Sequence, residues 1–350
     1  MKAQVLHTYD PSLTAPQWVR GQEVADPKIV KSSDVIIRIG GAGVCRTDLH
    51  IIEGIWRPHT DPSGTALLPL IMGHENAGWI EETGSEVEGF KKGDPVIVHP
   101  KVTGGTCIAC RRGHDMHGDG KFPGLDSNGG YAELLHTSVR NLIALPKTLA
   151  PKDVAPYADA GLTAYRAAKK AAQQLLPDQT AVVIGAGGLG HIGIQVLRAM
   201  CAARIIVVDI SDASLSLAAE HGADHLVKAD GGEVEAVLAL TGGKGAEAVL
   251  DFVGEKGTTK KGLDMTRPAG SYYVIGYGEE IRVPTVDMVI TEKNIIGNLV
   301  GTWAELTELM ALADRGLVEL ATKHYRLDQA NQALQDLHHG KIRGRAVLVP

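Results

Sequence analysis

The sequence has 350 residues, which is too long for one ordinary hydrophobic core and predicts about two domains. Lys and Arg number 35 and Asp and Glu number 41, so the formal net charge is −6 and we expect no nucleic-acid partner. Glycine is frequent, with 42 residues, but a 44% hydrophobic fraction and only 16 prolines exclude a collagen-like or disordered chain. The glycines are therefore expected in tight turns and close backbone approaches.

The four cysteines are too few for a disulfide framework, and the first residues lack the apolar stretch of an export signal. No apolar run approaches the roughly 18 residues that a membrane-spanning helix needs. We therefore expect a cytoplasmic protein with reduced thiols and no membrane partner.

The first 150 residues contain short strand-like runs, at 35–39 and 95–99, separated by Gly and Pro. No long helical pattern is present there. Two long excursions, 59–69 and 103–130, interrupt the strands, and loops of such length are usually functional or mobile. This part of the chain is predicted to be a β-rich domain.

The pattern changes near Asp159. Strand-like runs at 181–184, 205–209, 248–251 and 272–275 follow, and helical spacing lies between them at 189–199 and 211–221. Continuous apolar strands between amphipathic helices predict a parallel sheet that is covered on both faces. The last 50 residues add two predicted helices, 304–315 and 328–339, and a final strand at 345–349.

The segment 182–190 fits the pattern G-x-G-x-x-G between a predicted strand and a predicted helix, which is the context that a dinucleotide-binding turn requires. Gly185 permits the tight turn, Gly187 lets the backbone approach a pyrophosphate, and Gly190 lets helix and strand pack closely. The helix N-terminus then offers free N–H groups to the phosphates. A glycine-rich turn without a ligand is the alternative.

Asp209 ends the next predicted strand, 24 residues after Gly185. A carboxylate there accepts hydrogen bonds from both ribose hydroxyls and repels a 2′-phosphate. Ile210 and Ser211 follow, and neither is a cation that would bind that phosphate. The sequence therefore predicts NAD rather than NADP.

Two further clusters hold residues with ligand chemistry. Residues 43–50 read Gly-Val-Cys-Arg-Thr-Asp-Leu-His, and residues 73–75 read Gly-His-Glu. A thiolate with an imidazole is a zinc-type ligand pair. A lone Cys45 would more often be a small buried hydrophobe, but the accompanying polar clusters and the nucleotide fold favour a metal site.

With these motifs in their order and spacing, the sequence resembles the zinc-dependent alcohol dehydrogenases of the medium-chain dehydrogenase/reductase family over essentially its whole length. The likeness extends to 159–165 and to the terminal Gly-Arg-Ala-Val-Leu-Val-Pro. It implies an α/β protein with a distorted β-barrel catalytic domain, 1–158 and 299–350, and a Rossmann domain with a doubly wound parallel sheet, 159–298. It also implies a homodimer or homotetramer.

By position, the resemblance implies that Cys45, His74 and Asp159 are the catalytic zinc ligands, with a fourth coordination position open. Glu75 stands where the family has a carboxylate near the zinc. Asp48 would orient the His74 imidazole.

The implied reaction is reversible hydride transfer between an alcohol and NAD, giving an aldehyde or ketone. Zinc would act as a Lewis acid that lowers the pKa of the alcohol. The Thr47 hydroxyl would bridge the alcohol and the cofactor ribose, and His50 would pass the proton toward solvent. A solvent-exposed loop histidine is the alternative for His50.

Further cofactor contacts are implied by position alone, with ordinary strand-end residues as the alternative. They would lie at the pyrophosphate, the adenosine ribose and the nicotinamide: Arg46, Thr163, Gly188, Leu189, Ile210, Phe252, Val253, Ile275, Gly276, Asn298, Val300 and Arg345.

The family's second zinc lobe is altered in this chain. Cys107 and Cys110 hold two of the four ligand positions, but the other two fall on Gly104 and Gly118. Two thiolates cannot complete a tetrahedral site. A shifted loop could add ligands from His114, Asp115, His117 or Asp119. A metal-free lobe or a disulfide are the alternatives, and we expect one zinc per chain rather than two.

The substrate pocket is the least specified part. Ile51, Ile52, Trp56, Ile71 and Tyr277 stand where the family has pocket walls, with ordinary core as an equal alternative. If they line the pocket, it favours a hydrophobic primary or secondary alcohol over a polyol, and the segment 59–68 would form its entrance. A polyol dehydrogenase and a nucleotide-sensing protein are the other interpretations. A zinc-free reductase is disfavoured by the ligand triad.

Overall fold

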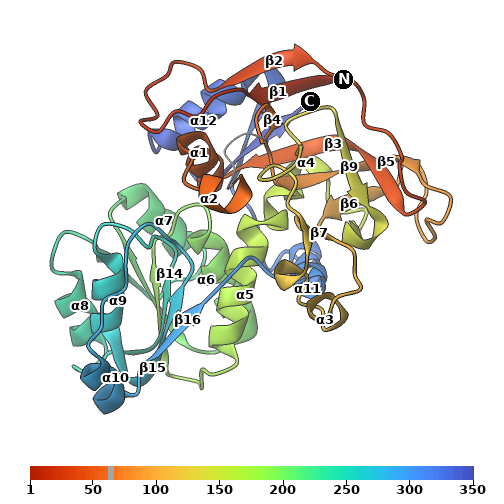
Figure 1. Cartoon of the computed structure of the whole chain (residues 1–350). Coiled ribbons are helices and arrows are strands. Elements are labelled where there is room, and N and C mark those ends of the chain that lie inside the picture. The colour runs from red at the N-terminus through yellow and green to blue at the C-terminus, as the bar shows by residue number, and fades with distance from the viewer. Residues whose placement is uncertain (62–66) are drawn as a thin grey trace. The chain divides into compact units, whose positions relative to one another are not determined.

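The structure is a computed structural model that describes residues 1–61 and 67–350. The chain divides into two compact units (Figure 1). The first comprises Met1–Ala160, Thr302–Asp314 and Leu320–Pro350, and the second comprises Gly161–Gly301 and Arg315–Glu319. Asp159 and Ala160 thus belong to the first unit. The predicted functional domains, 1–158 with 299–350 and 159–298, remain a prediction; residues 315–319 of the segment 299–350 lie in the second compact unit.

The first unit is built around a mixed sheet in which the strand order is β10-β6-β5-β3-β18-β17, with β9 paired to β3 beside this path. A second sheet has the order β2-β1-β4, and β7 pairs with β8. The strands are β1 (Lys2–Leu6), β2 (Val19–Glu23), β3 (Asp34–Val44), β4 (Leu70–Ile71), β5 (Glu75–Thr83), β6 (Pro95–Val98), β7 (Val102–Thr103), β8 (Gly120–Lys121), β9 (Leu134–Ser138), β10 (Leu142–Ala144), β17 (Thr322–Arg326) and β18 (Arg345–Val349).

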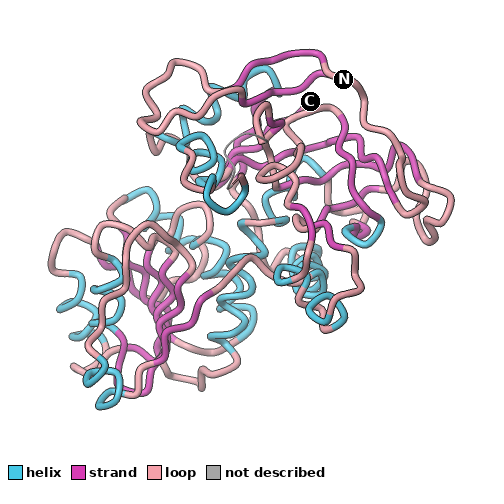
Figure 2. The backbone as a smooth tube through the Cα atoms, in the orientation of Figure 1, coloured by secondary structure: helices cyan, strands magenta, loops and turns pink. Residues whose placement is uncertain are grey.

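The helices of the first unit are mostly short. They are α1 (Arg46–Glu53), α2 (Arg57–Thr60), α3 (Ile108–Arg111), α4 (Pro151–Val154), α11 (Trp303–Asp314) and α12 (Ala330–His338), with 3-10 turns η1 (Asp115–His117), η2 (Val139–Asn141), η3 (Ala155–Ala158) and η4 (Leu327–Gln329). Figure 2 shows how much of this unit is loop and strand.

The strand β3 organises the first unit because it is 11 residues long and pairs with three neighbours, β5, β9 and β18. Its sequence, DVIIRIGGAGV, is buried at every position except Arg38. A strand covered on both faces reads as a continuous apolar run, as this one does. It ends at Val44, so the following residue, Cys45, leaves a rigid part of the sheet.

The second unit is a six-stranded, wholly parallel sheet with the order β13-β12-β11-β14-β15-β16. Its elements are α5 (Ala160–Ala172), β11 (Thr180–Ile184), α6 (Gly190–Met200), β12 (Arg204–Asp209), α7 (Asp212–Glu220), β13 (His225–Lys228), α8 (Glu233–Leu240), β14 (Ala246–Asp251), α9 (Thr258–Met265), β15 (Thr266–Val274), α10 (Thr285–Thr291) and β16 (Asn294–Gly297). In order of appearance this is 3-2-1-4-5-6, the Rossmann arrangement, with the switch point between β11 and β14.

Helices cover this sheet on both faces, as Figure 2 shows. The helix α6 packs with α7, and α8 packs with α9. The central strands β11 and β12 are buried almost throughout, because Ala, Val and Ile fill them. The predicted doubly wound sheet is thus present, and its carboxyl edge carries the turn 185–190.

The predicted strands and helices occur within a few residues of the expected positions, but several helices are missing from the prediction, among them α1, α5, α8, α9 and α10. The helix α1 follows Cys45 directly, and α5 spans 13 residues after Asp159. The signals were weak in both cases: Cys45 is an unusual N-cap residue, and α5 begins directly after the 3-10 turn η3.

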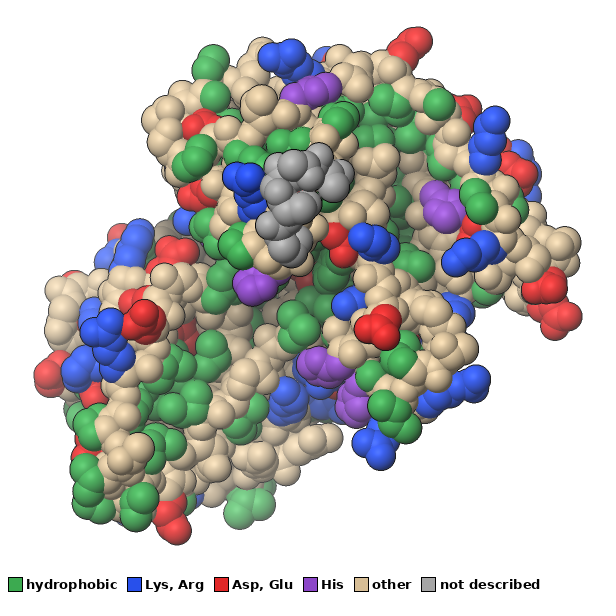
Figure 3. Space-filling model, in the orientation of Figure 1, with side chains coloured by type: hydrophobic (Ala, Val, Ile, Leu, Met, Phe, Trp, Pro, Cys, Tyr) green, Lys and Arg blue, Asp and Glu red, His purple; other side chains and the backbone are tan. Residues whose placement is uncertain are grey.

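Among the residues that the structure describes, no helix is long and apolar enough to cross a membrane. On the face drawn in Figure 3, acidic, basic and hydrophobic side chains are interspersed.

Candidate active site

The site begins where β3 passes into α1. Cys45 is the N-cap of α1, and the Asp48 carboxylate accepts a hydrogen bond from the Cys45 backbone N–H at 2.8 Å. This reciprocal arrangement is a capping box, which fixes the first turn of the helix. The spacing Cys-x-x-Asp puts Cys45 at the N-cap and Asp48 three residues later, so the thiol and the carboxylate lie on the same side of the first helical turn.

Asp48 also links the helix to His74. Its Oδ1 lies 3.4 Å from His74 Nδ1, and its Oδ2 accepts a hydrogen bond from the Tyr131 hydroxyl at 2.9 Å. All three side chains are fully or almost fully buried. Asp48 thus stands where the prediction put it, beside the imidazole. Tyr131 was not predicted, because nothing in the sequence around it marks a polar role.

Four potential ligand atoms converge at this point. One atom each from Cys45, His74, Glu75 and Asp159 lies within 4.8 Å of the others, and each residue is at most 8% exposed. The set joins the end of β3, the start of β5 and the residue after η3, so sequence positions far apart meet in one place. The residues predicted as zinc ligands are therefore brought together, with Glu75 beside them.

The residues fit a zinc ion. His74 Nε2 lies 3.2 Å from Asp159 Oδ2, yet both ring nitrogens of His74 are buried without a hydrogen-bond partner among the described residues. A buried polar atom left in this state costs free energy, and a metal ion removes that cost. Sulfur, imidazole nitrogen and carboxylate oxygen are the donors that zinc takes in catalytic sites.

The charges around His74 favour a bound cation. Burial lowers the pKa of His74, but the Asp48 carboxylate, followed by contacts with Asp159 and Cys45, outweighs burial and holds the pKa well above its usual value. The same negative groups that stabilise a proton on this ring would stabilise Zn²⁺, which requires the neutral imidazole.

The Glu75 carboxylate is fixed by contacts with Arg345 and with the backbone of Ala160. Arg345 Nη2 lies 2.6 and 2.5 Å from its two carboxylate oxygens, and the Ala160 backbone N–H donates to Oε1 at 3.0 Å. A Cβ on Gly43, which pairs with Glu75 across β3 and β5, would collide with this carboxylate. Arg345, predicted as a pyrophosphate ligand, is thus buried on Glu75, and its role toward the cofactor remains a prediction.

The residues predicted for proton transfer line the same helix. The Thr47 hydroxyl oxygen is 3.8 Å from Cys45 Sγ, and His50 Nε2 accepts a hydrogen bond from Arg46 Nε at 3.3 Å. Burial, followed by the charge of Arg46, lowers the pKa of His50 to about 4. His50 is therefore neutral near pH 7 and is not the exposed loop histidine considered as the alternative.

In the second unit, the turn between β11 and α6 has the geometry that the motif predicts. Gly185 adopts φ +84°, and a Cβ on Gly190 would collide with the Gly185 carbonyl oxygen. Around Gly187 no atom lies within 4 Å of a built Cβ, so the backbone there is open to a ligand. Gly188 and Leu189 complete the turn, and Leu189 is the N-cap of α6.

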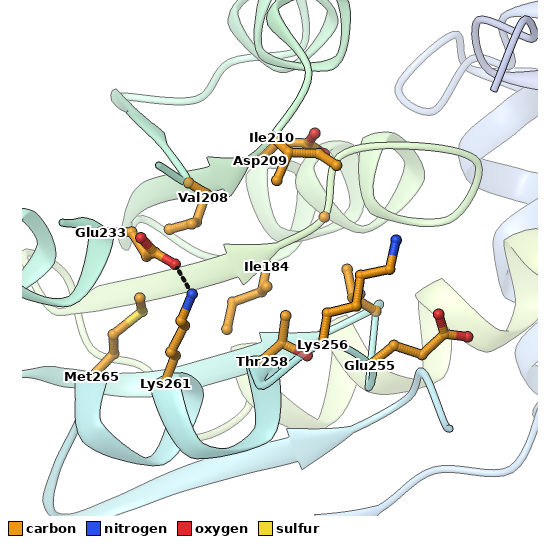
Figure 4. A pocket seen from close by; sticks show the side chains of 13 residues that line it. Ile184, Val208, Asp209, Ile210, Glu233, Glu255, Lys256, Thr258, Lys261 and Met265 are labelled. Atoms are coloured by element: carbon orange, nitrogen blue, oxygen red, sulfur yellow. Dashed lines mark hydrogen bonds and ion pairs between the residues drawn. The ribbon is translucent and has the colours of Figure 1, made fainter. Parts of the chain in front are cut away.

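Asp209 ends β12 and lies beside this turn. Its Oδ2 accepts a hydrogen bond from the Ala186 N–H and its Oδ1 from the Ser211 N–H, both at 2.7 Å. The carboxylate is thereby fixed at the wall of a cavity that is also lined by Gly185 and Met265, and the adjoining Ile210 is 70% exposed (Figure 4). This is the place where the prediction puts the adenosine ribose.

Other predicted cofactor residues lie at strand ends of the same sheet. Val253 lines the cavity, while Phe252 packs under Gly193 of α6. Ile275 and Gly276 follow β15, and Val300 follows β16 with φ +44°. The Asn298 amide donates to the carbonyls of Val274 and Ile296 and accepts from Lys170, while Thr163 is buried in α5. Their cofactor contacts remain predictions.

The altered zinc lobe, residues 104–118, does not bring its potential ligands together as the group of Cys45, His74, Glu75 and Asp159 does. Cys107 and Cys110 are free thiols with their sulfurs 3.1 Å apart, and a side chain at Gly118 would point at these sulfurs. Asp115 is engaged by Thr103 and Arg140, and the two histidines, His114 and His117, are exposed. Among described residues, no set of three ligand groups gathers in this segment.

Some of the residues predicted to line the substrate pocket lie in the hydrophobic core of the first unit. Ile51, Ile52 and Ile71 are buried in the main hydrophobic cluster of the first unit, and Trp56 packs against it. The alternative of ordinary core therefore holds for the three isoleucines, because α1 and β4 face inward. Tyr277 is 39% exposed in the second unit. Of the expected entrance, 59–68, residues 62–66 lie outside the described residues.

A nucleotide-type turn and a buried Cys-His-carboxylate group together define a zinc-type dehydrogenase, and the comparisons place the chain within that class. Residues 31–147 match the family model "Alcohol dehydrogenase GroES-like domain", and residues 188–315 match "Zinc-binding dehydrogenase". The chain is 36% identical to an NAD-dependent alcohol dehydrogenase of Sulfurisphaera tokodaii, over 94% of this chain and 96% of the relative. It is 34% identical to a D-arabinose 1-dehydrogenase (NADP(+)) of Saccharolobus solfataricus, over 91% of each.

The crystal structure of the alcohol dehydrogenase from Aeropyrum pernix is similar, with a TM-score of 0.94, 44% identity and full coverage of both chains. The chain therefore belongs to the zinc-type alcohol dehydrogenases of the medium-chain dehydrogenase/reductase family. The predictions of this family, of its α/β fold class, of an alcohol dehydrogenase and of zinc as a cofactor are confirmed.

Proposed function

We propose that this protein catalyses reversible hydride transfer between an alcohol and NAD, giving an aldehyde or ketone. The observation that carries the proposal is the buried group of Cys45, His74, Glu75 and Asp159, whose ligand atoms lie within 4.8 Å of one another. The glycine turn at 185–190 and the Asp209 carboxylate support the cofactor, and the NAD-dependent relatives support both.

In this proposal Cys45, His74 and Asp159 hold the zinc ion, and Glu75 is the carboxylate beside it. The ion supplies Lewis acidity, which lowers the pKa of the substrate hydroxyl. Asp48 orients His74 through the contact with Nδ1, and Arg345 neutralises Glu75. The Thr47 hydroxyl, close to Cys45 Sγ, would accept the alcohol proton while donating its own proton to a ribose hydroxyl of the cofactor. Neutral His50 would accept a proton from that ribose hydroxyl in turn and release it to solvent.

NAD is the proposed cofactor because Asp209 would repel a 2′-phosphate, and its two oxygens are already fixed by backbone N–H groups of Ala186 and Ser211. Arg46, Thr163, Phe252, Val253, Ile275, Gly276, Asn298, Val300 and Arg345 are proposed as further contacts. Functionally, residues 1–158 and 299–350 would bind metal and residues 159–298 the dinucleotide.

The proposed substrate is a hydrophobic primary or secondary alcohol. The support is local: Ile55 is 52% exposed and half-buried Trp56 follows it, directly after the helix that carries Thr47 and His50. A polyol is the alternative that the D-arabinose relative makes worth testing.

A homodimer or homotetramer in the cytoplasm completes the proposal. The helix α10, which precedes the edge strand β16 in the chain, exposes Val286, Val289 and Ile290, each more than half accessible. Apolar side chains beside an unpaired sheet edge are typical of an association surface. The cysteines are free thiols, as a reducing compartment would keep them.

The test is NADH formation with a panel of alcohols, before and after zinc removal by a chelator. Activity that is lost without zinc and restored by zinc supports the proposal, whereas full activity of the zinc-free protein contradicts it. Faster turnover of sorbitol than of a medium-length secondary alcohol would reverse the substrate assignment. Tighter binding of NADP than of NAD would contradict the role of Asp209.

A further inference from the structure

The cavity beside Asp209 has polar groups at both ends and an apolar surface between them (Figure 4). Ile184, Val208 and Met265 supply apolar lining, and Asp209 lies at one end. Glu233 and Lys261 lie away from Asp209 and form an ion pair with one another, which the dashed line in Figure 4 marks. Their presence is unexpected, because stacking of a base requires apolar walls only.

Glu233 is the first residue of α8 and is only 2% exposed. Its Oε1 lies 2.5 Å from Lys261 Nζ, and its Oε2 accepts a hydrogen bond from the Gly231 N–H at 2.8 Å. Burial raises the pKa of Glu233, but the hydrogen bonds from Lys261 and from backbone N–H groups outweigh burial and hold it below its usual value. The carboxylate is therefore ionised and faces an ammonium group.

The Lys261 side chain is 40% exposed, so its ammonium keeps part of its hydration, whereas the Glu233 carboxylate is almost fully buried and loses most of its own. A buried carboxylate that lines an apolar ligand cavity points to recognition. Each carboxylate oxygen accepts up to two hydrogen bonds, and an ammonium donates three. The pair therefore keeps acceptor and donor capacity toward the cavity after the contacts with each other and with Gly231 are made.

We propose that Glu233 and Lys261 are specificity-determining residues that recognise the adenine of the cofactor. The Glu233 carboxylate accepts a hydrogen bond from the 6-amino group, and the Lys261 ammonium donates one to the neighbouring ring nitrogen. An acceptor beside a donor matches the donor beside an acceptor on adenine. This inference rests on the proposed NAD-dependent function and adds to it the selection of the base.

The pair would reject a purine that carries oxygen at position 6. In hypoxanthine this oxygen would face the Glu233 carboxylate, so two acceptors would meet and a buried charge would lose a partner. Loss of one charge-assisted hydrogen bond corresponds to a roughly tenfold loss of affinity or more. We therefore expect nicotinamide hypoxanthine dinucleotide to have a KM at least about tenfold above that of NAD in the wild-type enzyme.

The test measures the ratio of the two KM values with one alcohol, in the wild type and in three variants. In Glu233→Gln the amide can donate to the oxygen of hypoxanthine, so the ratio should fall toward one. In Lys261→Met it should also fall, because the donor is lost. Lys260→Met is the matched control, since Lys260 lies on the same helix and pairs in solvent with Asp264 at 2.6 Å; it should keep the wild-type ratio.

Because the ratio compares two cofactors on one protein, a change in stability cancels. A wild-type ratio near one, or an unchanged ratio in both Glu233→Gln and Lys261→Met, would overturn the inference while leaving NAD-dependent activity intact. Failure of the proposed function is distinguishable, since the wild type would then reduce neither dinucleotide at saturating alcohol.

Discussion

Two regions of the first unit carry cysteines with metal-ligand spacing, and their surroundings differ sharply. Cys45 emerges from a strand that pairs with three neighbours and meets three other buried ligand residues. Cys107 is the N-cap of a four-residue helix that carries Cys110; this helix lies between short strands, with exposed histidines nearby. The difference shows that ligand residue types are not sufficient: a scaffold must hold them at one point and keep water away.

The largest expected effect is on catalysis at the buried group. Cys45→Ser replaces a thiolate ligand with a weak one, and loss of the metal's charge stabilisation should lower kcat/KM by roughly a thousandfold or more. Steady-state NADH formation measures it. Cys107→Ser is the matched control and should stay within a factor of about two, because that thiol lies outside the group. Equal losses in the two variants would remove the distinction between the regions.

A second effect concerns pH. The pKa of His50 is about 4 in the folded protein and about 6.5 when unfolded, so the unfolded chain binds more protons between these values. The free energy of unfolding is therefore lost as pH falls from 6.5 to 4, by about 3 kcal/mol from this residue. Denaturant unfolding of wild type and His50→Gln measures it, and the variant should lose about that much less.

His114→Gln is the control for this experiment, because His114 is exposed on the altered lobe. Its unfolding free energy should follow the wild-type pH dependence. If His50→Gln and the wild type lost stability in parallel over this range, the burial argument for His50 would be wrong.

Packing provides a third contrast. In Gly43→Ala the new methyl group would collide with the Glu75 carboxylate, and we expect a loss of about 1–3 kcal/mol in unfolding free energy. In Gly104→Ala no atom lies within 4 Å of the new methyl group, and stability should change by less than about 0.5 kcal/mol. Thermal or denaturant unfolding compares them, and a neutral Gly43→Ala would show that Glu75 can move freely.

The smallest expected effect is on metal content. We expect about one zinc per chain in the wild type and in the double variant Cys107→Ser/Cys110→Ser, because two thiolates cannot complete a tetrahedral site. Metal analysis of purified, dialysed protein measures it. Close to two zinc ions per wild-type chain, falling to about one in the double variant, would show that the lobe recruits further ligands.

Much of the fold could be predicted because its signals are local. Apolar runs such as 205–209 and the turn at 185–190 carry their own periodicity and chemistry, so strand, turn and helix follow in order. The helix α1 was missed because its N-cap is a cysteine, and the capping box with Asp48 is visible only when that thiol is considered as a cap.

The site could be predicted only as far as motifs mark it. Cys45, His74, Asp48 and Asp159 belong to recognisable segments, and the structure brings them together. Tyr131 and the cavity end formed by Glu233 and Lys261 belong to none, since their partners are distant in sequence and only tertiary packing joins them. The same reason explains why Ile51, Ile52 and Ile71 proved to be core: the direction in which an apolar side chain faces is not a local property.

The burial of the four ligand residues also has a consequence for exchange. The ligand side chains have little contact with solvent, so the open coordination position that the alcohol would occupy is also the route by which a chelator would reach the ion. Release of the ion to a chelator should then slow when an alcohol fills that position. The time that a metal ion resides in the protein would thus depend on the substrate concentration as well as on the four side chains.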